Sequence, residues 1–585
     1  MKEAVGGWRL TVGWPQRWLR AGSNDPRDVR IDVLWLLGLG LLLIGTGIGL
    51  RDPWPADEPR FALVARDMVA TGDWLVPRVG GDVYADKPPL FFWLMALALT
   101  VTRSLRVAFL LPSLLAGVGS VLLVYDLGRR LWNRETGFVA ALALLFTVQF
   151  TWQARQAQID AVLCFWTTLS LYGLLRHLVL GPQWRWYAIG CAAAGLGVIS
   201  KGVGFLPLLV FIPFVVLKAR GWSVPLFGSK LRWWLGPLAF LLAVSLWLVP
   251  MLLAARGDPV LAAYRDEILF RQTIDRYAKA WHHHEPFWYF VIQVMPVLWL
   301  PLTVLIPWLV PRWRAALGNK DLRLALLLSW IGLVVLFFSL SAGKRGVYIL
   351  PALPAFALAC APFLAELLAR QRVQRLGFIL GAFITFACAA GAIYTLVRAD
   401  KRVELLALYE LDVFLPLAAI AVVGLVLCAV VRPGRGVLLY CAVFATVLLV
   451  VSFLVNPAMN AARSGADFAR VVEQRTRNID ELGIIAFKEQ YLLQLHRPIV
   501  HFGHARWREA DQEAADAAAW LQQRPGRALI VNERMHAACF AEAASEPLVE
   551  ANRTRWFLVR GAPPPQCVGQ GHAQRAMRYV PPASF

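Results

Sequence analysis

The sequence predicts an α-helical protein that crosses a membrane many times and ends in a small α/β domain. Of its 585 residues, 58% are hydrophobic and only 17% are charged, whereas soluble domains are about 45–50% apolar and about 25% charged. The charges lie between long apolar segments, and after about Asn456 the composition becomes mixed. The surplus apolar surface therefore needs a lipid environment.

The formal net charge of +21 does not by itself indicate a nucleic-acid partner. A basic chain can bind nucleic acid, because Lys and Arg release counterions from phosphates. Here the basic residues form short clusters between apolar segments, as they do in cytoplasmic loops. The clusters lie near 129–134, 218–232, 312–323, 370–375 and 432–435. We therefore expect membrane lipids as partners and no nucleic acid.

The basic clusters also predict a topology. Residues 1–30 form a basic leader, and no small-residue cleavage site closes the apolar segment 31–50, which predicts an uncleaved anchor with a cytoplasmic N-terminus. The apolar run 90–101, about 12 residues, is too short to span the membrane and is expected at the interface. Placing the clusters inside gives about 13 spans in 31–455. Residues 51–105 and 255–287 then become periplasmic loops.

Residues 456–585 are expected to form a periplasmic α/β domain. Short β-rich runs alternate with helical stretches such as 509–523, a pattern typical of this class. The runs are 483–487, 498–502, 528–532 and 555–559. Cys539 and Cys567 lie in this domain, and in an oxidising periplasm a disulfide and two free thiols are equally compatible with the sequence.

The first loop carries candidate catalytic residues. Asp57 and Glu58 precede a segment, 58–70, whose apolar residues recur at helical spacing. We expect an amphipathic helix on the membrane surface, although the carboxylates could simply mark a helix start, where they complement the dipole. Asp86 and Lys87 precede the interfacial segment. A Lys there can bind a lipid phosphate or merely extend to the interface.

Four further ionisable residues stand at the outer ends of predicted spans. Such groups are costly at membrane depth and usually face a cavity. They are Asp160, Lys201, Lys344 and Arg345. Together with the loops they predict a site that opens to both lipid and periplasm and that takes an anionic lipid as substrate.

The second loop leaves a metal site open. It ends in His282-His283-His284-Glu285-Pro286, and three adjacent His residues cannot all point the same way. One or both of His283 and His284 could join Asp86 around a divalent ion such as Zn²⁺; the alternative is no metal. No cofactor is otherwise required, since the sequence contains no Walker-type phosphate loop and no dinucleotide fingerprint.

An ordered set of motifs over residues 31 to about 355 is similar to one family. The motifs are Ala56-Asp57-Glu58-Pro59-Arg60, Gly72-Asp73-Trp74, Pro77-Arg78, Asp86-Lys87-Pro88-Pro89-Leu90, His283-His284 before Pro286, and Lys344 with Tyr348 and Pro351. The set resembles the aminoarabinose transferase branch of the GT-C glycosyltransferases, which is related to the protein O-mannosyltransferases. The resemblance implies about 13 membrane helices, a catalytic domain over 31–455 and a periplasmic C-terminal domain.

The resemblance also implies an activity and its residues. The enzyme would be inverting and would move a sugar, 4-amino-4-deoxy-L-arabinose, from undecaprenyl phosphate to lipid A phosphate at the inner membrane. We also expect a monomer. Asp57 is the leading catalytic carboxylate, with Glu58 and Asp160 as further candidates. The candidate substrate-binding residues are Arg60, Asp86, Lys87, Lys201, Arg271, Lys344, Arg345 and Tyr348.

Two alternatives remain open. The aminoarabinose branch often has Glu-Lys-Pro where this chain has Asp86-Lys87-Pro88, so the shorter Asp leaves room for a relative with another sugar, or with a protein or glycan hydroxyl as acceptor. A transporter or flippase for a lipid-linked sugar is the alternative of another class. Transporters place their sites near the midplane on broken helices, whereas these charges gather at one face and in outer loops.

Overall fold

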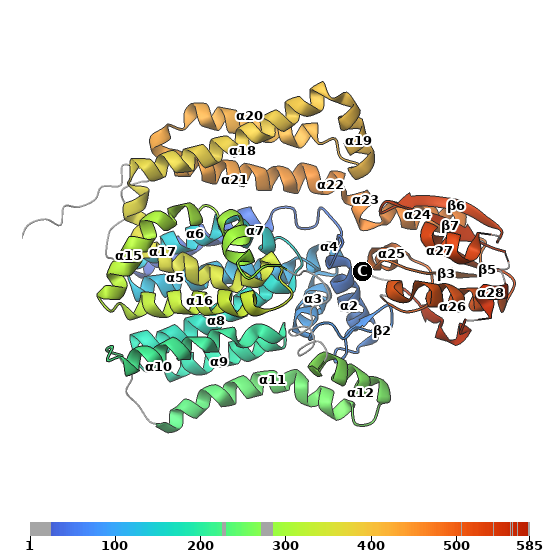
Figure 1. The fold of residues 1–585 in the computed structure, drawn as a ribbon, viewed down its shortest axis with the longest axis horizontal. Coiled ribbons are helices and arrows are strands. Elements are labelled where there is room, and N and C mark those ends of the chain that lie inside the picture. Colours follow the sequence, from blue (N-terminus) through green and yellow to red (C-terminus); the bar gives the residue numbers. More distant parts are fainter. Residues whose placement is uncertain are drawn as a thin grey trace, which may run out of the picture.

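The computed structural model describes residues 25–582, apart from 225–229, 271–284 and positions 505, 542, 562, 564 and 570. A body of helices is followed by a domain built on a sheet, which lies at one end of the body beside α2 and α3 (Figure 1). The fold is therefore the predicted one: a helical membrane protein with a C-terminal α/β domain.

The helical body begins with helices α1 to α12. They are α1 (Pro26–Gly40), α2 (Glu58–Thr71), α3 (Leu90–Thr102), α4 (Leu105–Ala108), α5 (Leu111–Leu131), α6 (Arg134–Leu145), α7 (Val148–Ala154), α8 (Ile159–Leu180), α9 (Trp184–Val198), α10 (Phe211–Ala219), α11 (Leu235–Ala254) and α12 (Pro259–Asp266). A two-stranded ribbon joins α2 to α3. It consists of β1 (Arg78–Val79) and β2 (Asp82–Val83).

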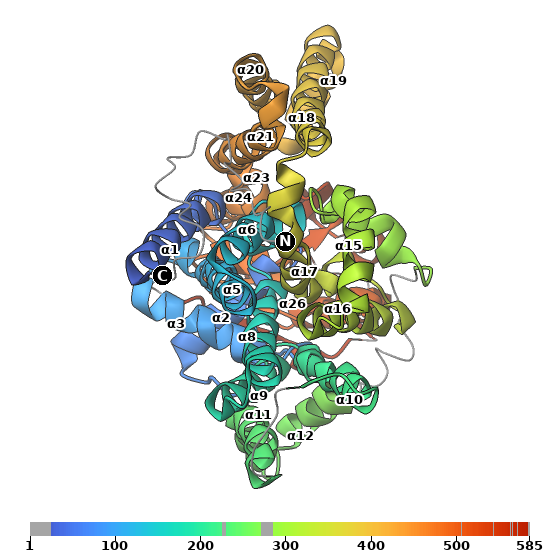
Figure 2. The ribbon, with the colours of Figure 1, turned by 90° about the vertical axis from the view of Figure 1, so that its left-hand side faces the viewer.

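The later helices complete the body. They are α14 (Met295–Leu298), α15 (Ile306–Gly318), α16 (Leu322–Leu340), α17 (Leu353–Leu368), α18 (Gln371–Val397), α19 (Ala399–Tyr409), α20 (Phe414–Val430), α21 (Gly436–Val450), α22 (Asn456–Ala458) and α23 (Asn460–Ser464). Among them, α18, α20 and α21 pack on one another along one edge of the body (Figures 1 and 2).

The number of membrane crossings is only partly defined. Among the described residues, 8 helices are long and apolar enough to span a membrane, or up to 11 if each bent helix pair counts as one span. The count of 13 therefore stays a prediction. The apolar run at 90–101 does form a separate helix, α3, of 13 residues.

Two glycines bring the helix ends that carry the site close together. A Cβ placed on Gly204 would lie 1.9 Å from the carbonyl carbon of Gly197, so the chain after α9 returns closely on that helix only because both residues lack side chains. This return begins at Lys201, which caps the 3₁₀ segment Gly202–Val210. The glycine pair thereby fixes where the Lys201 backbone leaves α9.

The C-terminal domain is a six-stranded mixed sheet with the order β6-β7-β5-β3-β4-β8. Strands β3, β4 and β5 are parallel, and the outer strands are antiparallel. Four strands match the predicted runs, and α26 matches the predicted helix. The elements are β3 (Glu481–Ile484), β4 (Ile499–His501), β5 (Arg527–Asn532), β6 (Ser545–Ala551), β7 (Thr554–Val559), β8 (Met577–Tyr579), α24 (Ala466–Arg475), α25 (Glu489–Gln494), α26 (Ala510–Gln522), α27 (Glu533–Met535) and α28 (Pro565–Val568).

The expectation that residues 58–70 lie as an amphipathic helix on the membrane surface is wrong. Helix α2 is buried on nearly all sides, because its polar face contacts the C-terminal domain. The Arg66 guanidinium donates to Leu492 O at 2.8 Å, and the Tyr579 hydroxyl donates to Asp67 Oδ1 at 2.7 Å. Burial raises the pKa of Asp67 to about 6. Helix α2 is therefore the joint between the two parts of the molecule.

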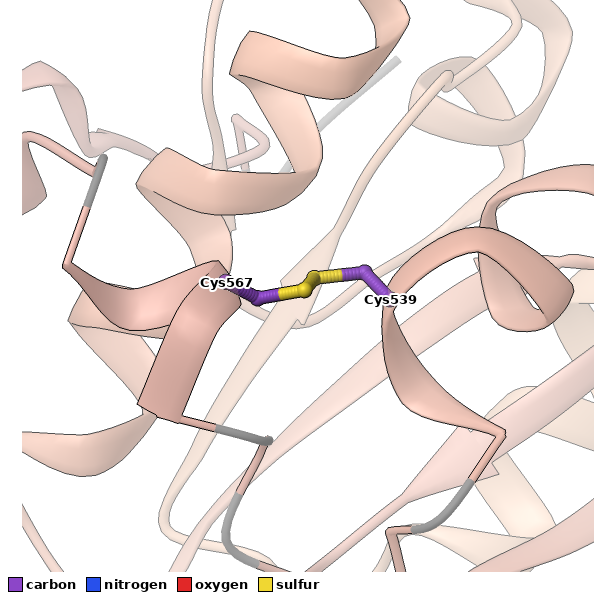
Figure 3. Close-up of a disulfide and its surroundings, with 2 residues drawn as sticks. All are labelled: Cys539 and Cys567. Carbon is purple, nitrogen blue, oxygen red and sulfur yellow. A yellow bond between two sulfur atoms is a disulfide. The ribbon is translucent and has the colours of Figure 1, made fainter.

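Cys539 and Cys567 form a disulfide (Figure 3). It joins the turn after α27 to α28, which packs against α26. The six other cysteines are free, and three of them, Cys164, Cys191 and Cys360, are buried in the helical body. Their burial is consistent with a packing role.

Cys567→Ser is expected to lower the free energy of unfolding of the C-terminal domain by about 2–4 kcal/mol. The bridge spans 28 positions of the sequence, and closing such a loop restricts the unfolded chain. Calorimetry of the purified protein measures the change, with Cys428→Ser, a free thiol, as the control. Equal unfolding temperatures for Cys567→Ser and the wild type would contradict the prediction.

Candidate functional site

A polar cavity of about 90 Å³ lies in the helical body, and one of its lining residues, Arg60, contacts the C-terminal domain. Residues from five separate stretches of the chain line it, and most of the predicted site residues are among them. The polar and aromatic lining residues are Asp57, Arg60, Phe61, Tyr84, Asp86, Lys87, Gln158, Asp160, Lys201, Arg345 and Tyr348.

Asp57 and Glu58 are adjacent in sequence but have different surroundings. Asp57 lines the cavity and is half-buried, with its Oδ1 3.8 Å from Arg60 Nη1. Glu58 is 7% exposed; its carboxylate accepts from Arg51 at 2.8 Å and from the Ala157 amide at 3.0 Å. The structure therefore places Asp57 in the site and Glu58 behind it, where Glu58 anchors the segment before Asp160.

Asp160 and Lys201 form a close ion pair in the cavity wall. Lys201 Nζ donates to Asp160 Oδ1 at 2.5 Å, and it lies 4.7 Å from the centre of the Tyr348 ring. Asp160 stands in the first turn of α8, where its charge complements the helix dipole. A cation held between a carboxylate and an aromatic face keeps a fixed position in the cavity.

Arg60 is held by the C-terminal domain, which the sequence did not reveal. Arg60 Nε donates to Glu489 Oε1 at 2.7 Å, and His504 Nε2 lies 2.9 Å from the same oxygen. Burial favours a higher pKa for Glu489, but His504 and Arg60 outweigh it and lower the pKa to about 2. Burial alone would lower the pKa of the Arg60 guanidinium, but Glu489 and Tyr84 raise it, so Arg60 stays charged beside Asp57.

Tyr84 is a lining residue that the motifs did not single out. Its ring is buried, and Arg60 lies 5.8 Å from the ring centre. Burial and the nearby Asp86 raise the pKa of the Tyr84 hydroxyl, so it remains protonated at neutral pH. The sequence offers only a weak signal for Tyr84 as a site residue, because it lies between β2 and Asp86 in a loop that already contains several candidates.

The remaining predicted residues line the cavity, lie beside it, or fall outside the described part of the chain. Lys344 is buried and donates to Glu285 O at 2.8 Å, so it ties the second loop to the body. Arg345 is exposed and lines the cavity. Arg271, His283 and His284 lie outside the described residues.

The zinc site likewise stays a prediction. Within the described ranges, no group of three or more His, Cys, Asp or Glu side chains is placed to hold a metal ion. Asp86 is the only one of the three predicted ligands that lies within those ranges. A carboxylate alone does not make a zinc site, which needs three or four protein ligands.

Comparisons with known proteins find relatives over part of the chain. Residues 86–249 match the family model described as dolichyl-phosphate-mannose-protein mannosyltransferase. The undecaprenyl phosphate-alpha-4-amino-4-deoxy-L-arabinose arabinosyl transferase of Pseudomonas aeruginosa is 32% identical over 57% of this chain and 60% of its own length. Arabinosyl transferase 2 of Pseudomonas fluorescens is 29% identical over 62% of this chain and 65% of its own. The chain thus spans less than two thirds of the length of these relatives.

A solved structure extends the likeness to nearly the whole chain. The crystal structure of ArnT from Cupriavidus metallidurans bound to undecaprenyl phosphate superimposes with a TM-score of 0.70, covering 91% of this chain and 98% of that one at 20% identity. The chain therefore has the same fold as that protein. The apo structure of the same protein gives a TM-score of 0.68. At this identity, the superposition shows the GT-C fold.

The cavity of this GT-C protein combines three carboxylates with four cations. Lys87, Lys201 and Arg345 offer positive charge to a phosphate, which Lys binds as a point charge and Arg with a planar fork. Asp57 adds a negatively charged hydrogen-bond acceptor to the same cavity. Such a cavity can bind a phosphorylated lipid and act on the bond beside its phosphate.

Proposed function

We propose that this protein is an inverting glycosyltransferase of the bacterial inner membrane. It moves 4-amino-4-deoxy-L-arabinose from undecaprenyl phosphate to a phosphate of lipid A on the periplasmic side. The observation that carries the proposal is the single cavity that brings Asp57 together with Lys87, Lys201 and Arg345. The names of the relatives from Pseudomonas support the choice of donor and sugar.

The proposed reaction is one direct displacement at the anomeric carbon. An oxygen of the acceptor attacks from the face opposite the donor phosphate, the new carbon–oxygen bond forms, and the bond to the phosphate breaks. Undecaprenyl phosphate leaves with the bonding electron pair. Lys87, Lys201 and Arg345 stabilise the negative charge that grows on it, since fixed cations act most strongly where charge develops in the transition state.

The role of Asp57 depends on the acceptor. A lipid A phosphate oxygen is already anionic, so Asp57 would orient the sugar or the acceptor and would transfer no proton. A hydroxyl acceptor would need Asp57 as general base. We therefore expect the rate with lipid A to stay flat between about pH 6 and 9. A rate that rises with a single ionisation would instead indicate a hydroxyl acceptor.

Mass spectrometry of lipid A tests the proposal most directly. Cells with the protein should carry lipid A heavier by one aminopentose on a phosphate, and cells with Asp57→Asn in its place should not. The same cells' periplasmic glycoproteins are measured in parallel. An unchanged lipid A together with a modified glycoprotein would overturn the acceptor while keeping the glycosyltransferase.

Lys201→Gln is expected to reduce kcat/KM by about 100-fold, the effect of removing one charge-stabilising donor from a transition state. The substitution also removes the ion pair with Asp160, so the unfolding temperature is measured alongside. Lys401→Gln is the matched control, because Lys401 forms an exposed ion pair with Glu404 far from the cavity. A kcat/KM within twofold of the wild type would exclude Lys201 from the reaction.

A further inference from the structure

The C-terminal domain has its own cavity, of about 220 Å³. It lies at the carboxyl ends of the parallel strands β3, β4 and β5, the edge at which open α/β sheets bind their ligands. It shares no lining residue with the cavity around Asp57. The lining residues that matter most are Phe487, Lys488, Arg506, Glu513, Asn532 and Trp556.

One carboxylate oxygen of Glu513 in this cavity has no hydrogen-bond donor among the described residues. Its side chain belongs to α26 and is 1% exposed. Glu513 Oε1 accepts from the Ala486 amide at 2.9 Å, whereas Oε2 is buried and has no partner among the described residues. Burial raises the pKa of Glu513 to about 7. An unsatisfied buried carboxylate oxygen is costly, and a hydroxyl or ammonium group of a ligand would satisfy it.

Apart from the exposed Lys488, the described lining carries no uncompensated positive charge, which favours a sugar ring over an anion. The Arg506 guanidinium donates to Asp516 Oδ2 at 2.8 Å and to Phe502 O at 3.0 Å, so its charge is already compensated. The aromatic side chains of Phe487 and Trp556 supply apolar wall area. Aromatic faces beside a carboxylate and an amide suit a hydroxylated ring, which has both C–H surfaces and O–H donors.

We propose that this cavity binds a single neutral or amino sugar ring, one hydroxyl or ammonium group of which donates a hydrogen bond to Glu513 Oε2. The volume supports one ring, because sites for larger, drug-sized ligands occupy about 300–1,000 Å³. The ring could be a free monosaccharide or the terminal residue of a glycan. The proposal concerns binding alone, so it does not depend on the transfer reaction.

Binding is measured on the purified full-length protein in detergent by saturation-transfer NMR. The probes are L-arabinose, D-galactose and D-glucosamine, each also as the terminal residue of a trisaccharide. At least one free sugar should bind, and Glu513→Gln should weaken it at least tenfold, while the exposed Glu550→Gln and the catalytic-site Asp57→Asn should not. Binding of the trisaccharide as well would identify a glycan end as the source, and binding of the free sugar alone a monosaccharide.

A measurement on the wild type keeps the proposal testable if Glu513→Gln fails to fold. Bound sugar should slow hydrogen exchange in residues 486–488, which line this cavity, and leave 158–160, which line the other one, unchanged. Three results would overturn the proposal: no probe binds the wild type, Glu513→Gln binds as the wild type does, or protection appears only at 158–160.

Discussion

Asp57→Asn is expected to lower the rate of sugar transfer at least 1,000-fold, or about 4 kcal/mol in the barrier. The amide keeps the size of the carboxylate but loses its charge, and with it the ability to accept a proton or to orient a cationic amino sugar. The fold should persist, because the Asp57 side chain makes no capping hydrogen bond to α2 and lies 3.8 Å from Arg60. Transfer is measured with a lipid-linked sugar and purified lipid A.

Two comparisons make the result specific. Asp400→Asn changes an exposed ion pair with Arg398 and should leave transfer within twofold. Glu58→Gln should instead reduce the yield of folded protein, since Glu58 binds Arg51 and the Ala157 amide in a buried position. If Asp57→Asn retained full activity, Asp57 could not be the central residue of the reaction.

Glu489→Ala should destabilise the protein by about 3–5 kcal/mol, the cost of removing one partner of a buried ion pair. It should also reduce kcat/KM by about one to two orders of magnitude, because Arg60 is then free to leave its place beside Asp57. The loss should fall mainly on kcat, since Arg60 would still be present. Unfolding temperature and kinetics are measured together, with the exposed Glu550→Ala as the control.

The loss of stability caused by Glu489→Ala should depend on pH. The pKa of Glu489 is lowered from its usual value of 4.5 to about 2, so the folded state favours the carboxylate. Its contribution is full above pH 4.5 and is lost as the pH falls toward 2. The stability gap between wild type and Glu489→Ala should therefore close in acid. A gap that stays constant from pH 7 down to pH 3 would contradict the ion pair.

The sequence predicted the local features well. The ordered motifs gave Asp57, Arg60, Asp86 and Lys87, and the structure places all four on one cavity. Four of the six strands were visible as short β-rich runs. Strand β6 contains Pro547, which pairs across a register shift, and β8 has only three residues, so neither shows a strand pattern of its own.

The contacts between the two parts of the molecule could not be predicted. Arg60 and Glu489 lie 429 residues apart, and no local pattern marks Glu489 as a partner. For the same reason the sequence wrongly predicts α2 on the membrane surface: Arg66 and Asp67 look like the solvent-exposed face of an amphipathic helix. In the structure both are buried. The carbonyl groups of Leu492 and Leu493 accept hydrogen bonds from Arg66, and the Tyr579 hydroxyl donates one to Asp67, so these groups replace water.

The hydrogen bond between Arg60 and Glu489 also sets when the cavity can take its final shape during synthesis. Asp57, Asp160 and Lys201 are all made before Glu489, so a chain still emerging from the ribosome already contains both sides of the cavity. Arg60 acquires its partner only after the segment with Glu489 has been made and folded against α2. A half-made chain in the membrane therefore lacks the contact that holds Arg60 beside Asp57, and the cavity reaches the geometry described here only after the C-terminal domain has folded.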